Sequence, residues 1–298
     1  MATSSPAASR LTIAYGYLSI AYLVALAVAV LAGYLVSPAH PLWVIAVADM
    51  AGTLVIFAFS RAFNNSSFYD PYWSLGPIAI VAYLLFSAPP GVDAVRSVLV
   101  SAAVIAWGLR LTYNFLRGWP GLHHEDWRYV DFRNNTGKWY WLVSFSGIHL
   151  FPTVMVYLGC LALWPALHST GAPFGALDVL ALVITAGAIL IETVADEQLR
   201  NYVRSQPEKG KTLDTGLWAW SRHPNYFGEM GFWWGLFFFG LAANAPAWWT
   251  IAGPLAITLL FLFASIPMIE KRMMRRRKDY ADYKKRVPSV IVPWPPRS

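Results

Sequence analysis

Eight long apolar runs divide this chain of 298 residues, and most have the length that an α-helix needs to cross the hydrocarbon core of a bilayer. A bilayer interior offers no water to backbone N–H and C=O groups, so a helix that bonds them internally is the expected element. No segment outside the runs is long enough for a separate soluble domain. We therefore expect an all-α transmembrane bundle of about seven or eight spans over residues 1–298. The runs cover residues 11–36, 41–60, 74–90, 93–116, 139–166, 175–199, 228–244 and 247–268.

The composition excludes an ordinary soluble protein, because 57% of the residues are hydrophobic and only 13% are charged. The first run is too long for a secretory signal peptide and is poor in flanking positive charge and in small residues for a cleavage site, so we expect it to remain in the mature chain. Cys160 is the only cysteine, which excludes a disulfide within the chain and a thiolate metal cluster.

The basic residues predict the orientation in the membrane, because Lys and Arg are retained on the cytoplasmic side of short loops. Arg10, Arg61, the loop 117–138, the loop 204–222 and the tail 271–286 all fall on one side of the bundle, and Arg96 is the exception. Both termini are therefore predicted to be cytoplasmic. This topology and attraction to anionic membrane lipids account for most of the net charge of +7, and nucleic acid is not an expected partner.

Several ionisable residues lie inside or at the ends of the apolar runs, where a charge is costly and marks function. Asp196 and Arg200 follow Glu192 at four-residue steps on one helix face, which we expect to line a cavity. Arg110 and Asn114 form a similar pair. An alternative is a purely structural ion pair between Arg110 and one of the two carboxylates. The ionisable residues are Asp49, Arg110, Glu192, Asp196, Glu229 and Glu270.

Two loops carry further polar residues. His123 and His124 precede Glu125 and Asp126, but adjacent histidines do not share a helix face, so no metal site is predicted and the loop is expected to cover a cofactor mouth. Asp70 precedes Pro71, where it can cap a helix. The alternative for Asp70 is catalysis, since a carboxyl in an apolar site can act as a proton donor.

The densest polar segment runs from Gly216 to Glu229 between two apolar runs. It contains the cation, imidazole, amide, phenol and carboxylate of Arg222, His223, Asn225, Tyr226 and Glu229. Unsatisfied polar groups at a membrane boundary are costly, so this segment is expected to bind a polar partner such as a polyanionic cofactor.

Four segments and two tyrosines of this chain resemble a known protein family. Leu109–Thr112, Asp196–Arg200, Gly216–Glu229 and Ser265–Arg272, together with Tyr280 and Tyr283, resemble the membrane reductases that include the steroid 5α-reductases, and more closely their bacterial branch, the DUF1295 proteins. The resemblance runs from about the third span to the C-terminus. It implies a reductase-like core over residues 63–298 and added N-terminal spans over residues 1–62.

The resemblance implies an integral protein of the bacterial inner membrane, with an NADPH site that faces the cytoplasm. The residue types suit this cofactor, because Arg and Lys pair with phosphates, carboxylates hold ribose hydroxyls or the carboxamide, and aromatic rings pack on the bases. The cofactor-binding residues would be Arg110, Asn114, Asp196, Arg200, Lys211, Trp218, Arg222, His223, Asn225, Tyr226, Glu229, Glu270, Arg272 and Tyr283.

The implied reaction is hydride transfer to a carbon–carbon double bond of an apolar substrate that enters from the bilayer. Steroid 5α-reductases polarise the substrate carbonyl with an adjacent Gln and Glu and a Tyr, but Trp73, Ser74 and Trp107 occupy the corresponding places here. The implied substrate is a steroid- or lipid-like enone, for which Asp70 and a neighbouring tyrosine would replace the missing acid. Asp70, Tyr72 and Tyr113 are the candidate proton donors.

The Arg-His-Pro-x-Tyr-x-Gly core is also similar to that of isoprenylcysteine and phospholipid methyltransferases, which bind S-adenosylmethionine. Those enzymes have a Glu-Glu pair on the last span, where this chain has Ile269 and Glu270. Methyl transfer is therefore the alternative activity. A third class is a lipid or sterol carrier without catalysis, whose polar groups only line a cavity.

Overall fold

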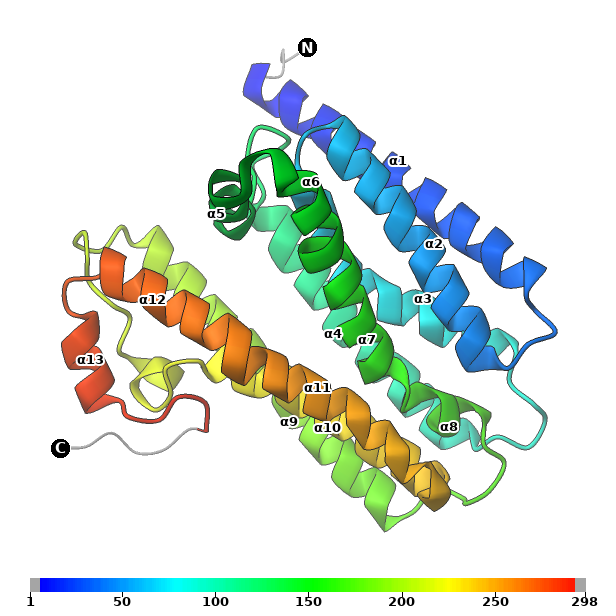
Figure 1. The fold of residues 1–298 in the computed structure, drawn as a ribbon. Helices are drawn as coiled ribbons and strands as arrows, with labels where there is room; N and C mark the ends of the chain where they lie inside the picture. The colour runs from blue at the N-terminus through cyan, green and yellow to red at the C-terminus, as the bar shows by residue number, and fades with distance from the viewer. Residues whose placement is uncertain (1–5, 293–298) are drawn as a thin grey trace, which may run out of the picture.

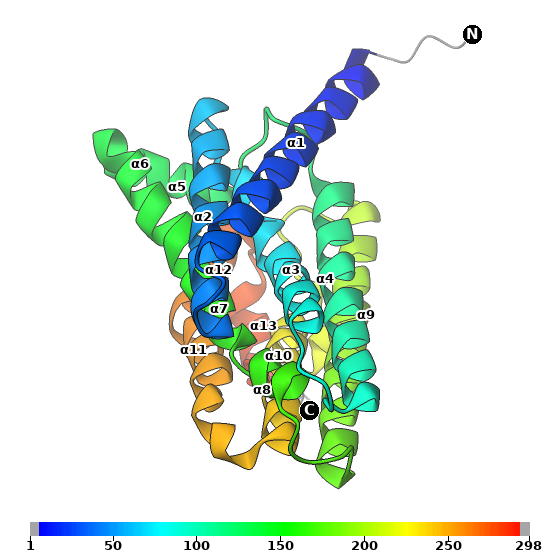
Figure 2. The ribbon, with the colours of Figure 1, turned by 90° about the vertical axis from the view of Figure 1, so that its right-hand side faces the viewer.

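The computed structural model describes the backbone of residues 6–292 and the side chains from Arg10 to Val292, and every regular element in this part of the chain is helical. Figures 1 and 2 show an elongated bundle in which α1 and α2 lie on one side, α9 to α12 lie on the other, and α3 and α4 run between them. The α-helices are α1 (Pro6–Leu35), α2 (Pro41–Ala62), α3 (Tyr72–Phe86), α4 (Ala94–Gly118), α5 (Trp127–Thr136), α6 (Tyr140–Val143), α7 (Phe151–Cys160), α8 (Leu163–His168), α9 (Ala176–Arg204), α10 (Pro224–Ala243), α11 (Ala252–Leu260), α12 (Ile266–Arg276) and α13 (Tyr280–Arg286).

Six helical segments within residues 6–292 are long and apolar enough to cross a membrane, so the expected all-helical membrane bundle is confirmed at this level. Two of the eight expected spans, those of α3 and α10, are not among these six segments. The helix α3 has 15 residues, and at about 1.5 Å per residue it is shorter than a hydrocarbon core of about 30 Å. The helix α10 has 20 residues, and many of its side chains are buried against other helices. The six segments are Arg10–Leu35, Pro41–Ala62, Ala94–Gly118, Trp127–Cys160, Ala176–Arg204 and Ala245–Arg276.

Two of these segments contain a π-helical turn directly before a proline. The π-helix η3 (Ser144–Leu150) precedes Pro152, and η6 (Phe261–Ser265) precedes Pro267. Proline has no N–H and its ring collides with the carbonyl one turn earlier, so a wider turn lets the helix continue. The sequence run 139–166 is correspondingly built from α6, η3, α7 and α8.

The first helix, α1, is attached to the rest of the bundle by its buried face and by two tyrosines. Ala14, Leu18 and Ala21 pack in a cluster that includes Phe68. The Tyr15 hydroxyl donates to the Leu116 carbonyl at 2.7 Å, and the Tyr22 hydroxyl donates to the carbonyl of Phe68 at 2.9 Å.

Close packing of α9 and α10 depends on glycine. A Cβ atom at Gly228 would lie 2.6 Å from the Cβ of Glu192 and 2.7 Å from the Ala188 carbonyl oxygen. Small residues let membrane helices approach in this way, and here the approach places Glu192 beside the first turn of α10.

Replacing Gly228 with Ala should lower the free energy of unfolding by about 1–3 kcal/mol, because the added methyl meets the backbone of α9. Gly187→Ala is the matched control, since a Cβ there meets nothing within 4 Å. The control should be neutral or more stable by up to about 1 kcal/mol, the helix propensity difference. Thermal unfolding of the detergent-solubilised variants measures both effects, and equal midpoints would contradict the prediction.

Candidate active site

Asp196 on α9 is the point at which side chains from three helices meet. Its Oδ2 accepts from Arg110 Nη1 at 2.8 Å and from Asn114 Nδ2 at 3.0 Å, both from α4. Asn225, in the first turn of α10, is a further hydrogen-bonding neighbour. Arg110 Nη2 also lies 2.6 Å from Glu192 Oε2. The predicted four-residue rows on α4 and α9 therefore face each other.

Glu229 lies near this cluster and is held by three indole N–H groups. Trp73 and Trp233 donate to its Oε1 at 2.8 and 3.0 Å, and Trp107 donates to Oε2 at 3.0 Å. The donors come from α3, α10 and α4, so this one carboxylate fixes the three helices relative to one another. Only 4% of Glu229 is exposed, and its hydrogen-bonding capacity is largely used within the protein.

Carboxylates outnumber cations around Asp196. Glu192, Asp196 and Glu229 lie around the single guanidinium of Arg110. The Nε of Arg110 has no hydrogen-bond partner among the described residues. Buried carboxylates in excess of cations favour a ligand that donates hydrogen bonds or carries positive charge.

A second cluster joins the segment before α10 to the C-terminal tail. Arg222 Nε pairs with Glu270 Oε1 at 2.7 Å, and its Nη1 donates to the carbonyls of Val287 and Pro288, each at 2.9 Å. Glu270 also contacts Lys284 at 2.6 Å and His223 at 3.4 Å. These contacts satisfy much of the hydrogen-bonding capacity of Arg222.

The other predicted cofactor-binding residues lie around these two clusters. Trp218 donates to the Ala195 carbonyl at 3.1 Å, and the hydroxyl of buried Tyr283 donates to the Trp218 carbonyl at 2.7 Å. The Tyr226 ring stacks on His223 with centroids 5.5 Å apart.

Three predicted cations lie outside the clusters. Arg200 is half-buried on α9, with an Nε that has no hydrogen-bond partner among the described residues, and Lys211 is exposed. The guanidinium of Arg272 lies 3.9 Å from the ring centroid of Trp127, which connects α12 with α5.

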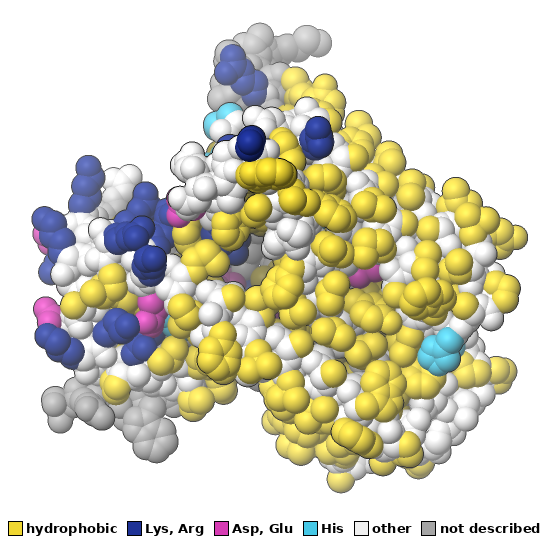
Figure 3. Space-filling model, viewed as in Figure 1, with side chains coloured by type: hydrophobic (Ala, Val, Ile, Leu, Met, Phe, Trp, Pro, Cys, Tyr) yellow, Lys and Arg dark blue, Asp and Glu magenta, His cyan; other side chains and the backbone are white. Residues whose placement is uncertain are grey.

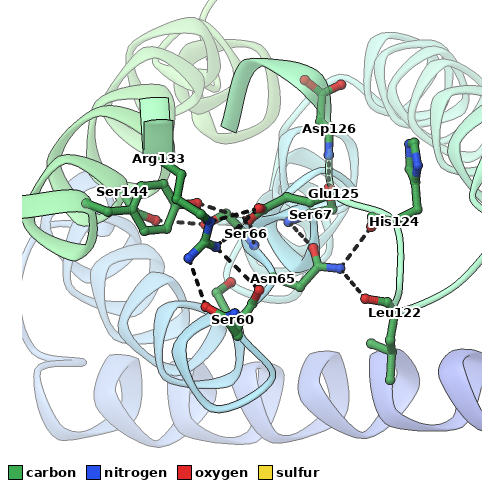
Figure 4. Close-up of polar contacts among 12 residues, drawn as sticks. Ser60, Asn65, Ser66, Ser67, Leu122, His124, Glu125, Asp126, Arg133 and Ser144 are labelled. Carbon is green, nitrogen blue, oxygen red and sulfur yellow. Dashed lines mark hydrogen bonds and ion pairs between the residues drawn. The ribbon is translucent and has the colours of Figure 1, made fainter. Parts of the chain in front are cut away.

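The loop 119–126 packs on the segment after α2. Figure 4 shows that Asn65 donates to the carbonyls of Leu122 and His124, and that Glu125 accepts from the Ser66 backbone N–H. Arg133 completes this network on Glu125. Within residues 6–292 no three His, Cys, Asp or Glu side chains are arranged to hold a metal ion.

The three predicted catalytic residues occupy separate places. Asp70 caps no helix, because α3 starts after Pro71 without a side-chain cap, and its Oδ1 instead accepts from the Tyr129 hydroxyl at 2.5 Å. Tyr72 is buried and donates to Asp49 Oδ1 at 2.8 Å. Tyr113 is 60% exposed and lies in a groove of about 380 Å³ between α1 and α4.

Several residues of this region were missing from the sequence-based site. Glu192 carried a signal, its four-residue spacing from Asp196, but was not included in the predicted cofactor site. Trp73 and Trp107 stand at the places of the family's substrate-polarising residues, but their contact with Glu229 was not predicted, and Trp233 carried no signal. Lys284 reaches Glu270 only because the tail folds back.

Comparison with known proteins identifies the family of the chain. A family profile described as "protein of unknown function (DUF1295)" matches residues 56–287, and the chain belongs to that family. The chain is 30% identical over 256 residues, 78% of its length, to an uncharacterized protein of Schizosaccharomyces pombe, of which 74% is covered. No solved structure matches the chain. The resemblance to DUF1295 seen in the sequence is thus confirmed, and α1 lies outside the matched region.

Replacing Glu270 with Ala should release the C-terminal tail, because Arg222 and Lys284 lose their shared carboxylate. Loss of one partner of a buried ion pair costs about 3 kcal/mol. Limited proteolysis should cut near α13 faster than in the wild type. Asp282→Ala is the control, since its pair with Lys285 is exposed and contributes little. Equal cleavage rates for Glu270→Ala and the wild type would contradict this prediction.

Burial raises the pKa of Asp70 from 3.8 to about 7, and Arg128 partly opposes this. A raised pKa in the folded state means that the protonated carboxyl stabilises the fold below about pH 4, and that this contribution disappears as the pH rises to about 7. Asp70→Asn remains neutral, so its thermal midpoint should rise relative to the wild type across this range. The control is Asp282→Asn at an exposed position, whose thermal midpoint should follow the same pH dependence as that of the wild type. The same pH dependence for Asp70→Asn would contradict the raised pKa of Asp70.

Proposed function

We propose that the protein is an NADPH-dependent membrane reductase that saturates a carbon–carbon double bond in an apolar substrate by hydride transfer. The observation that carries this proposal is the convergence of Arg110, Asn114 and Asn225 on Asp196, at the junction of α4, α9 and α10. A carboxylate surrounded by amides inside a membrane bundle suits ribose hydroxyls or a carboxamide, which both donate and accept hydrogen bonds.

The remaining groups around this junction fit other parts of the cofactor. Arg200, Lys211 and Arg272 supply cations for phosphate groups at the same end of the bundle. The rings of Tyr226 and Trp218 can pack on the planar bases. Arg222, His223, Glu270 and Tyr283 would act indirectly, because they hold the tail beside the start of α10.

The chemistry implies a proton donor near the substrate. NADPH, when bound, supplies the hydride, and the chain must supply a proton to the neighbouring carbon. Tyr72 is the strongest of the three predicted donors, because it is buried and hydrogen-bonded to a carboxyl. Asp70 is bonded to Tyr129, and Tyr113 lies in an exposed groove.

We further propose that the substrate enters from the bilayer and that the cofactor site faces the cytoplasm of a bacterial inner membrane, with both chain termini on that side. Figure 3 supports this orientation, because Lys and Arg side chains gather over α12 and α13 while a broad apolar surface covers the rest of this face. Membrane lipids are then direct neighbours of the apolar surface, and no nucleic acid is needed.

Methyl transfer from S-adenosylmethionine is the alternative, and one observation favours it. The carboxylates of Glu192, Asp196 and Glu229 exceed the single cation of Arg110, and a sulfonium ion would balance them.

Binding of NADPH, NADH and S-adenosylmethionine to the solubilised protein tests the proposal. NADPH should bind, and Asn225→Ala should weaken its affinity about tenfold, which corresponds to one buried hydrogen bond of about 1.4 kcal/mol. Asn201→Ala, on the exposed surface of α9, should bind like the wild type. Binding of S-adenosylmethionine alone would establish the alternative, and binding of none of the three would favour the carrier class.

A further inference from the structure

A line of buried polar side chains runs between α2 and the helix formed by η3 and α7. Thr53 and Ser60 on α2 face Thr153 and His149. All four side chains are buried, at 0–3% exposure, within segments that are apolar enough to span a membrane. Polar groups in such an interface are costly and often mark a path for ions or protons. We call this line the polar seam. Its two ends are Asp49 and Glu125.

Asp49 on α2 forms one end of the polar seam, and it is 8% exposed. The Tyr72 hydroxyl lies 2.8 Å from both its Oδ1 and its carbonyl oxygen, and Oδ2 has no hydrogen-bond partner among the described residues. Gly52 makes this arrangement possible, because a Cβ there would lie 2.7 Å from the Tyr72 hydroxyl.

The ionisable neighbours of Asp49 carry no positive charge. They are the phenols of Tyr69, Tyr72 and Tyr157 and the thiol of Cys160, and no ion pair to Asp49 exists within residues 10–292. A carboxyl buried in an apolar region without a cation favours its neutral, protonated form. Asp49 can therefore hold a proton.

Hydroxyl groups connect Asp49 with the middle of the seam. Thr53 lies beside the Tyr72 hydroxyl, and its Oγ1 lies 2.8 Å from Thr153 Oγ1. Thr153 in turn lies 2.8 Å from the Tyr69 hydroxyl. Each hydroxyl can both donate and accept, so the chain can pass a proton by rotation.

A second chain leads from the middle of the seam to the loop before α5. The Ser60 hydroxyl contacts His149 Nε2 at 2.9 Å. His149 Nδ1 donates to the Ser144 carbonyl at 2.9 Å, and the Ser144 hydroxyl lies 3.5 Å from the same nitrogen. Ser66 links Ser144, at 2.9 Å, to the Tyr140 hydroxyl, at 2.7 Å.

Tyr140 donates to Glu125 at 3.0 Å, which completes the second chain. Figure 4 shows this outer end, with Ser66, Ser144 and Glu125 around Arg133. The two chains meet where the ring of Tyr69 packs on His149, with centroids 5.1 Å apart, and Thr153 lies one helical turn from His149. Small side-chain movements here and between Tyr72 and Thr53 would make the path continuous from Glu125 to Asp49.

We propose that the polar seam conducts protons from Glu125 to the buried pair of Tyr72 and Asp49, in which Tyr72 is the proton donor and Asp49 holds the proton that replenishes it. How this proton is used rests on the proposed function. In that reaction bound NADPH would supply the hydride, and the O–H bond of Tyr72 would break as the second C–H bond forms. The Tyr72 oxygen would regain a proton from the Asp49 carboxyl, and Asp49 would regain one through the seam, so each cycle would consume one proton from the side of Glu125.

Infrared spectroscopy of the reconstituted protein tests the seam without any substrate. The difference spectrum between the wild type and Asp49→Asn should contain the C=O stretch of a protonated carboxyl. After transfer to D₂O this band should shift quickly in the wild type. The double variant Thr53→Val/Thr153→Val should shift about tenfold more slowly, which corresponds to about 1.4 kcal/mol of added barrier.

The matched control is Thr185→Val/Thr193→Val on α9, whose hydroxyls bond to their own helix and which should exchange at the wild-type rate. If the seam double variant does not fold, Tyr72→Phe interrupts the same chain with its ring retained. An absent Asp49 band, or equal exchange rates in all folded variants, would overturn the proposal. Failure to bind NADPH would instead overturn the proposed function and leave the exchange result unchanged.

Discussion

The close contact of α9 with α10 at Gly228 is the constraint on which the site depends. Because no side chain separates the two helices there, Glu192 packs against the first turn of α10. This brings Asn225 to Asp196, and Glu229 to the tryptophans of α3 and α4. A wider spacing between the helices would leave these carboxylates without their donors, inside a region with little water to replace them.

Three sets of polar groups differ in how far their hydrogen bonds are satisfied within the protein. Arg222 and Glu270 satisfy each other and fasten the tail, so their contribution is to the fold. The cluster around Asp196 has more carboxylates than cations and an unpartnered Arg110 Nε, which leaves capacity for a ligand. The polar seam lies in the other half of the bundle and ends at an unpartnered oxygen of Asp49. A reductase that takes its hydride from one half and its proton from the other would use both sets.

Length and hydropathy were sufficient to predict the helical membrane bundle, and residue spacing predicted the row of Arg110 and Asn114 and the row of Glu192 and Asp196. The pairing of Arg110 with these carboxylates was the structural alternative, and the structure contains it. The same signals assigned a span to the run that forms α3, which has only 15 residues. An apolar run does not reveal where the helix within it begins and ends. The cap expected from Asp70 was also wrong, because Tyr129 lies close enough to bind its carboxylate.

The class of molecule, its helical segments, the asymmetry of its basic residues and its family could all be predicted from the amino-acid sequence. These follow from local composition and motif, since the bilayer imposes helix formation on apolar segments regardless of their neighbours. Which buried charges are paired, and which retain free hydrogen-bonding capacity, depends on the packing of the helices. Glu229 between its tryptophans and Asp49 beneath Tyr72 result from contacts between distant helices, which the spacing within one helix does not encode.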